Sequence, residues 1–125
     1  MINLGKIKIG KNLPPVIIID LGINHSGSLD KAIYLSDLAI KNGAKIIKHQ
    51  THIADEEMSS EAKKIIPGNA SKSIYSIIKR FSLSYDDEKK LMNYIKQKNC
   101  IFISTPFCKM AVDRLVKFKI PLFKI

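Results

Sequence analysis

Short β-branched runs alternate with helical segments along this chain, and this alternation restricts the fold more than any other feature. Residues 16–19 form a continuous apolar run, which is typical of a strand buried on both faces. Residues 45–50 and 101–105 are further strand candidates, and residues 121–125 begin a fourth. Strands that are joined by helical crossovers pair in parallel. The sequence therefore predicts an α/β fold with a parallel sheet.

The first crossover has clear helix boundaries. Ser28 is a candidate N-cap, and residues 29–41 have apolar side chains at helical spacing. The pair Asn42 and Gly43 then provides a typical helix end. After the third strand, a further helix is predicted from about residue 110 to residue 118.

A long insertion, residues 51–84, separates the second strand from its own helix, which is predicted over residues 85–97. The insertion contains a helical piece at residues 74–81. Long ordered insertions usually carry function. At the amino end, alternating residues 1–12 predict a short strand or hairpin that closes the bottom of a barrel.

The charge balance is strongly basic, with 21 Lys and Arg residues and a net charge of +10. These residues are spread along the chain and include only two arginines, Arg80 and Arg114. Base readout favours arginine, so a lysine-rich solvated surface fits better than a nucleic-acid interface. Small anionic substrates are also compatible with this charge.

The composition indicates a globular intracellular chain. Apolar residues make up 46% of it, which is sufficient for a core. No apolar run reaches the roughly 18 residues of a membrane span, and no signal-peptide pattern is present, so we expect a cytoplasmic protein. Cys100 and Cys108 are expected to be free thiols, since they match neither a metal-binding nor a disulfide pattern.

Polar side chains gather at the carboxyl ends of the predicted strands. In parallel barrels functional residues lie at these ends, and side chains alternate between the interior and the helix-facing side. The first strand places Asp20 on the same face as Val16 and Ile18. The same alternation, applied to each predicted strand, places a polar side chain at its carboxyl end on the same face as the apolar residues before it. These side chains are Asp20, Lys48 with Gln50, Thr105, and Lys124. We therefore expect a polar pocket at the barrel mouth.

The residue types in this pocket indicate an anionic ligand. Two converging lysines, Lys48 and Lys124, suit a phosphate ester or a carboxylate. Gln50 and Thr105 are neutral hydrogen-bonding groups, and Asp20 is suited to orient a hydroxyl or to move a proton.

The three histidines have different expected roles. His49 has the opposite parity to Lys48, so it is expected to face the helices as a structural residue. For His25, two roles stay open: lining the mouth of the barrel and supporting the scaffold. A metal site formed only by His25, His49 and His52 is not expected, because no helical pair and no clearly placed carboxylate accompany them.

As an ordered series, the motifs of this chain resemble those of the sialic acid (N-acetylneuraminate) synthase family from about residue 14 onward. The matching segments are residues 20–28 (DLGINHSGS), 48–52 (KHQTH), 55–59 (DEEMS), 66–70 (IPGNA), 73–75 (SIY), 102–107 (FISTPF) and 123–125 (FKI). Each segment alone is weakly specific, but their order is highly specific. The resemblance implies a partial (β/α)8 TIM barrel with about the first four strands and a long insertion after the second.

The resemblance also implies an activity. The family condenses phosphoenolpyruvate with N-acetylmannosamine, or with a related N-acetylated amino sugar, to form a nonulosonic acid with release of phosphate. A divalent metal, manganese or magnesium, is expected in the complete enzyme, with ligands outside this chain. Family members are homodimers, and no nucleic acid or membrane partner is implied.

The resemblance also implies roles for individual residues of this chain. The positions that match phosphoenolpyruvate contacts are Lys48, Gln50, Thr105 and Lys124. Asn69 in the insertion matches a sugar-contacting position, and Phe107 matches a residue that lines the site. Asp20 matches the catalytic carboxylate, although the family usually has Glu there, so this carboxylate reaches one methylene less.

The chain length sets the remaining expectations. A complete barrel takes about 250 residues, so residues 1–125 are expected to be the N-terminal part of the barrel domain, without its C-terminal half and without the family's antifreeze-like domain. Such a truncated form is expected to be inactive alone. Two alternatives stay open: a half-barrel that works only in assembly with a partner chain or with itself, and a basic nucleic-acid-binding protein.

Overall fold

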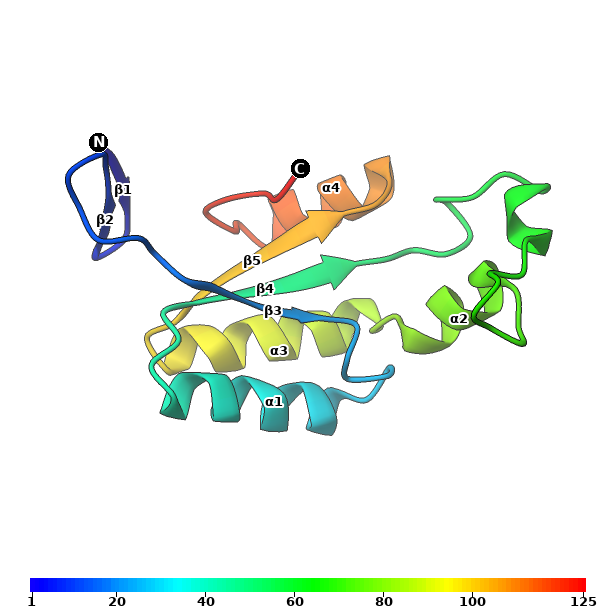
Figure 1. Cartoon of the computed structure of the whole chain (residues 1–125), viewed down its shortest axis with the longest axis horizontal. Coiled ribbons are helices and arrows are strands. Elements are labelled where there is room, and N and C mark those ends of the chain that lie inside the picture. Colours follow the sequence, from blue (N-terminus) through cyan, green and yellow to red (C-terminus); the bar gives the residue numbers. More distant parts are fainter.

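A computed structural model describes all 125 residues, Met1–Ile125. The chain forms a hairpin, a parallel sheet and helices that cover one face of that sheet (Figure 1). In chain order the elements are β1 (Ile2–Leu4), β2 (Ile7–Ile9), β3 (Ile18–Gly22), α1 (Leu29–Lys41), β4 (Ile46–Thr51), the 3-10 turn η1 (Ala62–Lys64), α2 (Ile74–Phe81), α3 (Tyr85–Gln97), β5 (Ile101–Pro106) and α4 (Lys109–Lys117).

The sheet has the strand order β3-β4-β5, and both pairings are parallel. This confirms the α/β class and the parallel topology. Alternate residues of the strands face two different clusters. Ile47 and Phe102 lie in the main core under the helices, whereas Ile46 and Ile103 face the opposite side. The predicted alternation along the strands is therefore present.

The helix boundaries largely follow the sequence. Ser28 caps α1, with its hydroxyl accepting a hydrogen bond from the Lys31 N–H at 3.2 Å. The predicted helices at residues 29–41, 74–81 and 85–97 are confirmed at both ends, and α4 starts one residue before the expected position. None of these helices has the length and apolar character that crossing a membrane requires.

The hairpin of β1 and β2 closes the amino ends of the parallel strands. Its buried residue Leu4 packs with Ile46 and Ile103, which lie on the face of the sheet opposite the helices. Gly5 forms the turn with a φ of +58°, a conformation that favours glycine. The insertion that carries α2 extends from the other end of β4, so the two segments mark opposite ends of the sheet (Figure 1).

The first predicted strand has different boundaries in the structure. β3 begins at Ile18, not Val16, because no strand pairs with Val16 or Ile17, which follow two prolines. It also lies at the edge of the sheet, so the prediction of burial on both faces was wrong. Ile17 is 73% exposed and Ile18 is 48% exposed. A β-branched run has the same pattern at an edge as in a sheet centre, which explains the error.

The predicted fourth strand over residues 121–125 is reduced to a single parallel bridge. Phe123 pairs with Ser104 at the open edge of β5, and residues 121–125 are all exposed. Both cysteines are free, as expected, with Cys100 buried and Cys108 partly buried.

Candidate functional site

The carboxyl ends of the three strands bring together four of the predicted side chains, which we call the strand-end group: Asp20, Lys48, Gln50 and Thr105. Asp20 lies opposite Lys48 in the register, and Gln50 lies opposite Thr105. Lys48 Nζ is 2.8 Å from Asp20 Oδ2, and its side chain is only 16% exposed. An ion pair thus joins β3 to β4 at the predicted mouth.

The strand-end group lies on the face of the sheet that the helices leave open. Lys48 and Gln50 alternate with His49 and Thr51, and the latter two contact Glu88 of α3. Because side chains of opposite parity point to opposite faces, Lys48 and Gln50 point away from the helices. The parity prediction is confirmed on this point.

A bulge at the end of β3 shapes the space beside this group. The register shifts between Asp20 and Gly22, and Gly22 has a φ of +54°. A Cβ atom at Gly22 would lie 3.4 Å from Asp20 Oδ1 and 3.7 Å from Gln50 Nε2. The missing side chain therefore leaves room between a carboxylate and an amide.

Lys124 reaches the same end of the sheet by a backbone contact. Its N–H donates to the Ser104 carbonyl at 3.0 Å, which holds it beside the end of β5. The residue is exposed. The structure thus places Lys124 on the far side of β5 from Lys48.

A second polar cluster lies next to the strand-end group and was not predicted. His52 is buried, with Nδ1 2.8 Å from Glu57 Oε2 and Nε2 3.2 Å from Gln50 Oε1. Its ring stacks on Phe107, with the ring centroids 4.0 Å apart and the planes 18° apart. Phe107, expected to line the site, therefore packs on a histidine that contacts Gln50.

Asn69 stands apart from these residues. It is exposed and lines a surface hollow of the insertion together with Lys72, Ser76 and Arg80. The insertion is held by the Tyr75 hydroxyl, which donates to Asp55 Oδ1 at 2.5 Å and keeps the pKa of that carboxyl below its usual value. Asn69 is at the carboxyl end of the sheet but touches no member of the strand-end group.

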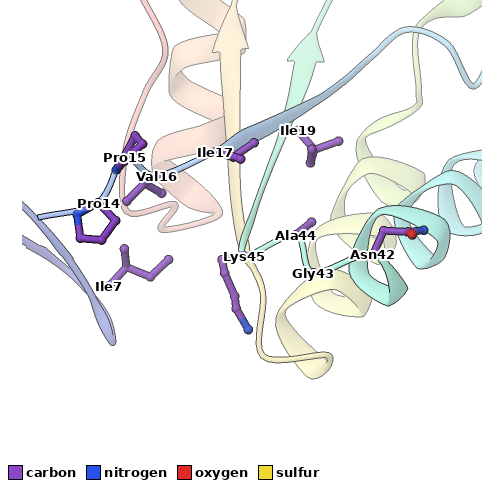
Figure 2. A pocket seen from close by; sticks show the side chains of 10 residues that line it. All are labelled: Ile7, Pro14, Pro15, Val16, Ile17, Ile19, Asn42, Gly43, Ala44 and Lys45. Atoms are coloured by element: carbon purple, nitrogen blue, oxygen red, sulfur yellow. The ribbon is translucent and has the colours of Figure 1, made fainter.

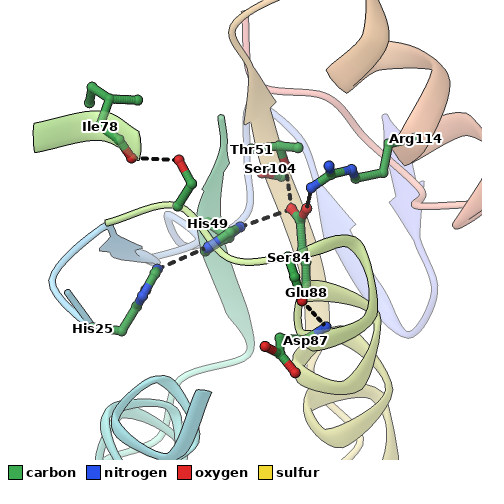
Figure 3. Close-up of polar contacts among 10 residues, drawn as sticks. His25, His49, Thr51, Ile78, Ser84, Asp87, Glu88, Ser104 and Arg114 are labelled. Atoms are coloured by element: carbon green, nitrogen blue, oxygen red, sulfur yellow. Dashed lines mark hydrogen bonds and ion pairs between the residues drawn. The ribbon is translucent and has the colours of Figure 1, made fainter. Parts of the chain in front are cut away.

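Beneath the strand ends, a buried hydrogen-bond network joins the helices to the sheet (Figure 3). Glu88 of α3 is its centre and accepts from Arg114 Nη1 at 2.9 Å and from His49 Nδ1 at 3.0 Å. Thr51 also donates to Glu88, and Ser104 lies 2.7 Å from the Thr51 hydroxyl. No buried side-chain nitrogen or oxygen in the chain lacks a partner.

The backbone fixes the proton positions in this network. The Gly27 N–H donates to His25 Nδ1 at 3.1 Å, so a neutral His25 carries its proton on Nε2. That proton points to His49 Nε2 at 3.1 Å, which leaves the His49 proton on Nδ1 and directed at Glu88. Three successive hydrogen bonds therefore run from the Gly27 N–H through His25 and His49 to the Glu88 carboxylate.

The charges in the network follow from burial and hydrogen bonding. Burial, together with the neighbouring His49, lowers the pKa of His25 to about 4. Burial alone would raise the pKa of Glu88, but the hydrogen bonds from His49, Thr51 and Arg114 outweigh it and hold that pKa below its usual value. At neutral pH the network contains an ionised Glu88–Arg114 pair and an uncharged His25.

These contacts assign structural roles to two histidines. The expectation for His49 is confirmed, since it faces α3. His25 is fully buried and does not line the mouth. The sequence did contain a signal for Glu88, because it shares the buried face of α3 with Leu91, Met92 and Ile95 at helical spacing. An acidic residue at such a position requires buried partners.

The chain offers no metal site. No group of three or more His, Cys, Asp or Glu side chains is arranged to hold an ion. The histidine nitrogens contact Gly27, Glu88, Glu57 and Gln50, and the Nε2 atoms of His25 and His49 contact each other. The side chains present therefore do not form a site for the divalent metal that the resemblance implies, whose ligands are expected outside this chain.

An apolar hollow lies elsewhere, along the exposed edge of β3 (Figure 2). It is lined by Pro14, Pro15, Ile17 and Ile19 and by the turn that carries Lys45. This hollow lies toward the amino ends of the strands and contains no member of the strand-end group.

Comparisons with known proteins show which family the chain resembles. The model of the NeuB family matches residues 35–125. The chain is 34% identical over 119 residues to the spore coat polysaccharide biosynthesis protein SpsE of Bacillus subtilis, covering 94% of this chain and 32% of that protein. It is 32% identical over 114 residues to the N,N'-diacetyllegionaminic acid synthase of Campylobacter jejuni, covering 88% of this chain and 34% of that enzyme.

A solved structure shows the same fold. The N-acetylneuraminic acid synthetase of Leptospira borgpetersenii, crystallised in complex with citrate, superimposes with a TM-score of 0.84 at 29% identity. The match covers 99% of this chain and 40% of that one. The chain spans about a third of the length of the curated relatives that it matches. By its family match and its fold, the chain belongs to the NeuB family of sialic acid and related nonulosonic acid synthases.

Proposed function

We propose that this chain supplies the phosphoenolpyruvate-binding side of a synthase that forms a nonulosonic acid. The observation that carries the proposal is the strand-end group, in which Lys48, Gln50 and Thr105 share one face of adjacent parallel strands beside Asp20. A cation and two neutral hydrogen-bonding groups at one sheet edge suit a ligand with a phosphate and a carboxylate.

Each side chain has a proposed task. Lys48, and Lys124 beyond β5 at the same end of the sheet, neutralise the anionic groups of phosphoenolpyruvate, while the Gln50 amide and the Thr105 hydroxyl hold its oxygens in place. The ligand displaces the Asp20 carboxylate from Lys48, and Asp20 is then free to orient a hydroxyl or to accept a proton. In the proposed reaction, the methylene carbon of phosphoenolpyruvate bonds to the aldehyde carbon of the sugar, water adds at the adjacent carbon, and phosphate leaves with C–O cleavage.

The proposed sugar is N-acetylmannosamine or a related N-acetylated amino sugar. Relatives named as legionaminic, pseudaminic and N-acetylneuraminate-9-phosphate synthases support this class. The insertion with Asn69 lies beyond the same end of the strands as the strand-end group, so it is available to contact a sugar there (Figure 1).

We also propose that β3, β4 and β5 are consecutive strands of a (β/α)8 barrel. Their parallel order, the helices on one face and the hairpin at their amino ends support this arrangement. Barrel active sites lie at the carboxyl ends of the strands, where the strand-end group is found.

Calorimetric titration of the 125-residue chain with phosphoenolpyruvate tests the proposal. Lys48→Met is expected to weaken binding about ten- to hundredfold, as removal of a hydrogen bond between charged groups does. Lys96→Met, on the exposed side of α3, removes the same charge away from the site and is expected to leave binding unchanged. Equal losses in both variants would show non-specific attraction to a basic surface and would contradict the proposed site.

A further inference from the structure

His52 is placed between two oxygen atoms. Glu57 Oε2 faces its Nδ1 at 2.8 Å, and Gln50 Oε1 faces its Nε2 at 3.2 Å. A carboxylate oxygen and an amide oxygen both accept hydrogen bonds, whereas a neutral imidazole has a single N–H. With one proton, one of the two contacts would bring lone pairs together. With the Gln50 oxygen toward His52, this geometry holds one more proton in the His52–Glu57 pair than a neutral ring and an ionised carboxylate would hold.

From this geometry we propose that His52, with Glu57, is a positioning residue for Gln50. The doubly protonated ring donates to Glu57 on one side and to the Gln50 carbonyl oxygen on the other. Because an amide carries its oxygen and its NH2 on opposite sides, this contact turns the Gln50 NH2 toward the strand-end group. There it acts as a donor to the anionic ligand. The inference rests on the proposed function for the identity of that ligand.

The position of the Gln50 amide agrees with this role. Its Nε2 is on the side of Gly22, 3.7 Å from the point where a Cβ of that glycine would lie, and Asp20 Oδ1 is 3.4 Å from the same point. If His52 loses its extra proton, Nε2 becomes an acceptor and the amide must turn over to donate to it. The Gln50 oxygen would then face the ligand and repel an anion.

The surroundings keep His52 in this position. Phe107, directly after β5, stacks on the ring and shields it from solvent. The charged group in contact with His52 is Glu57, and the Glu57 side chain is 5% exposed. Of the other charges near the strand ends, Lys48 pairs with Asp20 and Lys109 of α4 pairs with Asp113, whereas the exposed Lys124 donates to the Ile125 carbonyl oxygen. An anion bound beside Gln50 adds a further negative charge near the protonated ring.

Ring-nitrogen NMR on the 15N-labelled 125-residue chain tests the proton count without any ligand. We expect both His52 nitrogens to show the shifts of protonated nitrogens at pH 7, and the Gln50 side-chain amide shift to differ between the unmodified chain and Glu57→Gln. Glu57→Gln removes the carboxylate and is expected to leave a neutral ring at pH 7. Glu56→Gln is the matched control, since the Glu56 side chain is exposed and makes no hydrogen bond or ion pair. A neutral His52 ring in the unmodified chain at pH 7 would overturn the inference.

Phosphoenolpyruvate titrations then test the effect on the ligand. Loss of one donor to a charged group predicts about ten- to hundredfold weaker binding for Glu57→Gln and unchanged binding for Glu56→Gln. Equal binding by both variants would refute the positioning role while leaving the proposed function intact. A doubly protonated His52 in a chain that binds no phosphoenolpyruvate would establish the Gln50 contact and refute the proposed function.

Discussion

Asp20 Oδ2 lies 2.8 Å from Lys48 Nζ across the β3–β4 pair, and the two residues are direct partners in the register. The lysine side chain is largely buried, whereas the Asp20 side chain is 53% exposed. The carboxylate thus occupies a position that an oxygen of an anionic ligand would need. Under the proposed function, binding of an anionic ligand at this site is a competition between two anions for one lysine.

This competition predicts opposite effects of two substitutions on phosphoenolpyruvate affinity. Asp20→Asn removes the competing negative charge and is expected to tighten binding several-fold, while Lys48→Met weakens it. Asp86→Asn, exposed on α3, controls for the change in net charge. Calorimetry gives all three dissociation constants, and weaker binding by Asp20→Asn than by Asp86→Asn would disprove the competition.

Glu88 is expected to be the polar residue on which folding depends most. Replacing it with Gln leaves the partly buried Arg114 without a counterion, and removing one partner of a fully buried pair costs about 3 to 5 kcal/mol, which is the upper bound here. Urea unfolding measures the loss. The double variant Glu88→Gln/Arg114→Met should recover part of it, because no uncompensated charge remains. Additive losses from the two single changes would show that the pair is not coupled.

The stability of the chain should fall in mild acid because of His25. In the unfolded chain this histidine titrates near 6.5, and in the folded chain its pKa is lowered to about 4. The unfolded state therefore binds more protons between these values, so the stabilisation is complete above pH 6.5 and is lost as pH falls toward 4. The shift corresponds to roughly 3 kcal/mol.

Urea unfolding between pH 7.5 and 4.5 measures this dependence. The His25→Gln variant is expected to have a lower free energy of unfolding than the unmodified chain at pH 7.5, but to lose less of it as the pH falls to 4.5. Parallel curves for the two proteins would assign the acid sensitivity to other groups.

Gly27 is expected to tolerate no side chain. Its φ is +81°, and a Cβ there would lie 2.3 Å from the Arg80 carbonyl oxygen at the end of α2. Gly43 is a matched control, with a φ of +92° and no atom within 4 Å of such a Cβ. Gly43→Ala should cost about 1 to 2 kcal/mol for the backbone conformation alone, and Gly27→Ala clearly more. Thermal unfolding compares the two, and equal losses would show that the clash is relieved without cost.

The sequence predicted those features that depend on local order. The bounds of α1, α2 and α3 were predicted to the residue, and the caps Ser28 and Asn42-Gly43 supported those of α1, because helix caps and apolar spacing both act over one helical turn. The period of two along the strands separated Lys48 and Gln50 from His49. The motif series named the family, which the comparisons confirm. The alternation of strands and helices also predicted the parallel sheet.

Other features depend on which segments meet in space. A β-branched run does not reveal whether it lies at an edge, so the exposure of Ile17 and the start of β3 at Ile18 emerged only from strand pairing.

Contacts between polar or aromatic side chains far apart in the sequence were also not predicted. Glu88 meets His49 across 39 positions of the chain, and His52 meets Phe107 because β4 and β5 are neighbours. Sequence alone determined which side chains share a face, since alternation is a property of the backbone. Only the tertiary structure decided which of them pair, because hydrogen bonds require atoms about 3 Å apart and that proximity is created by packing.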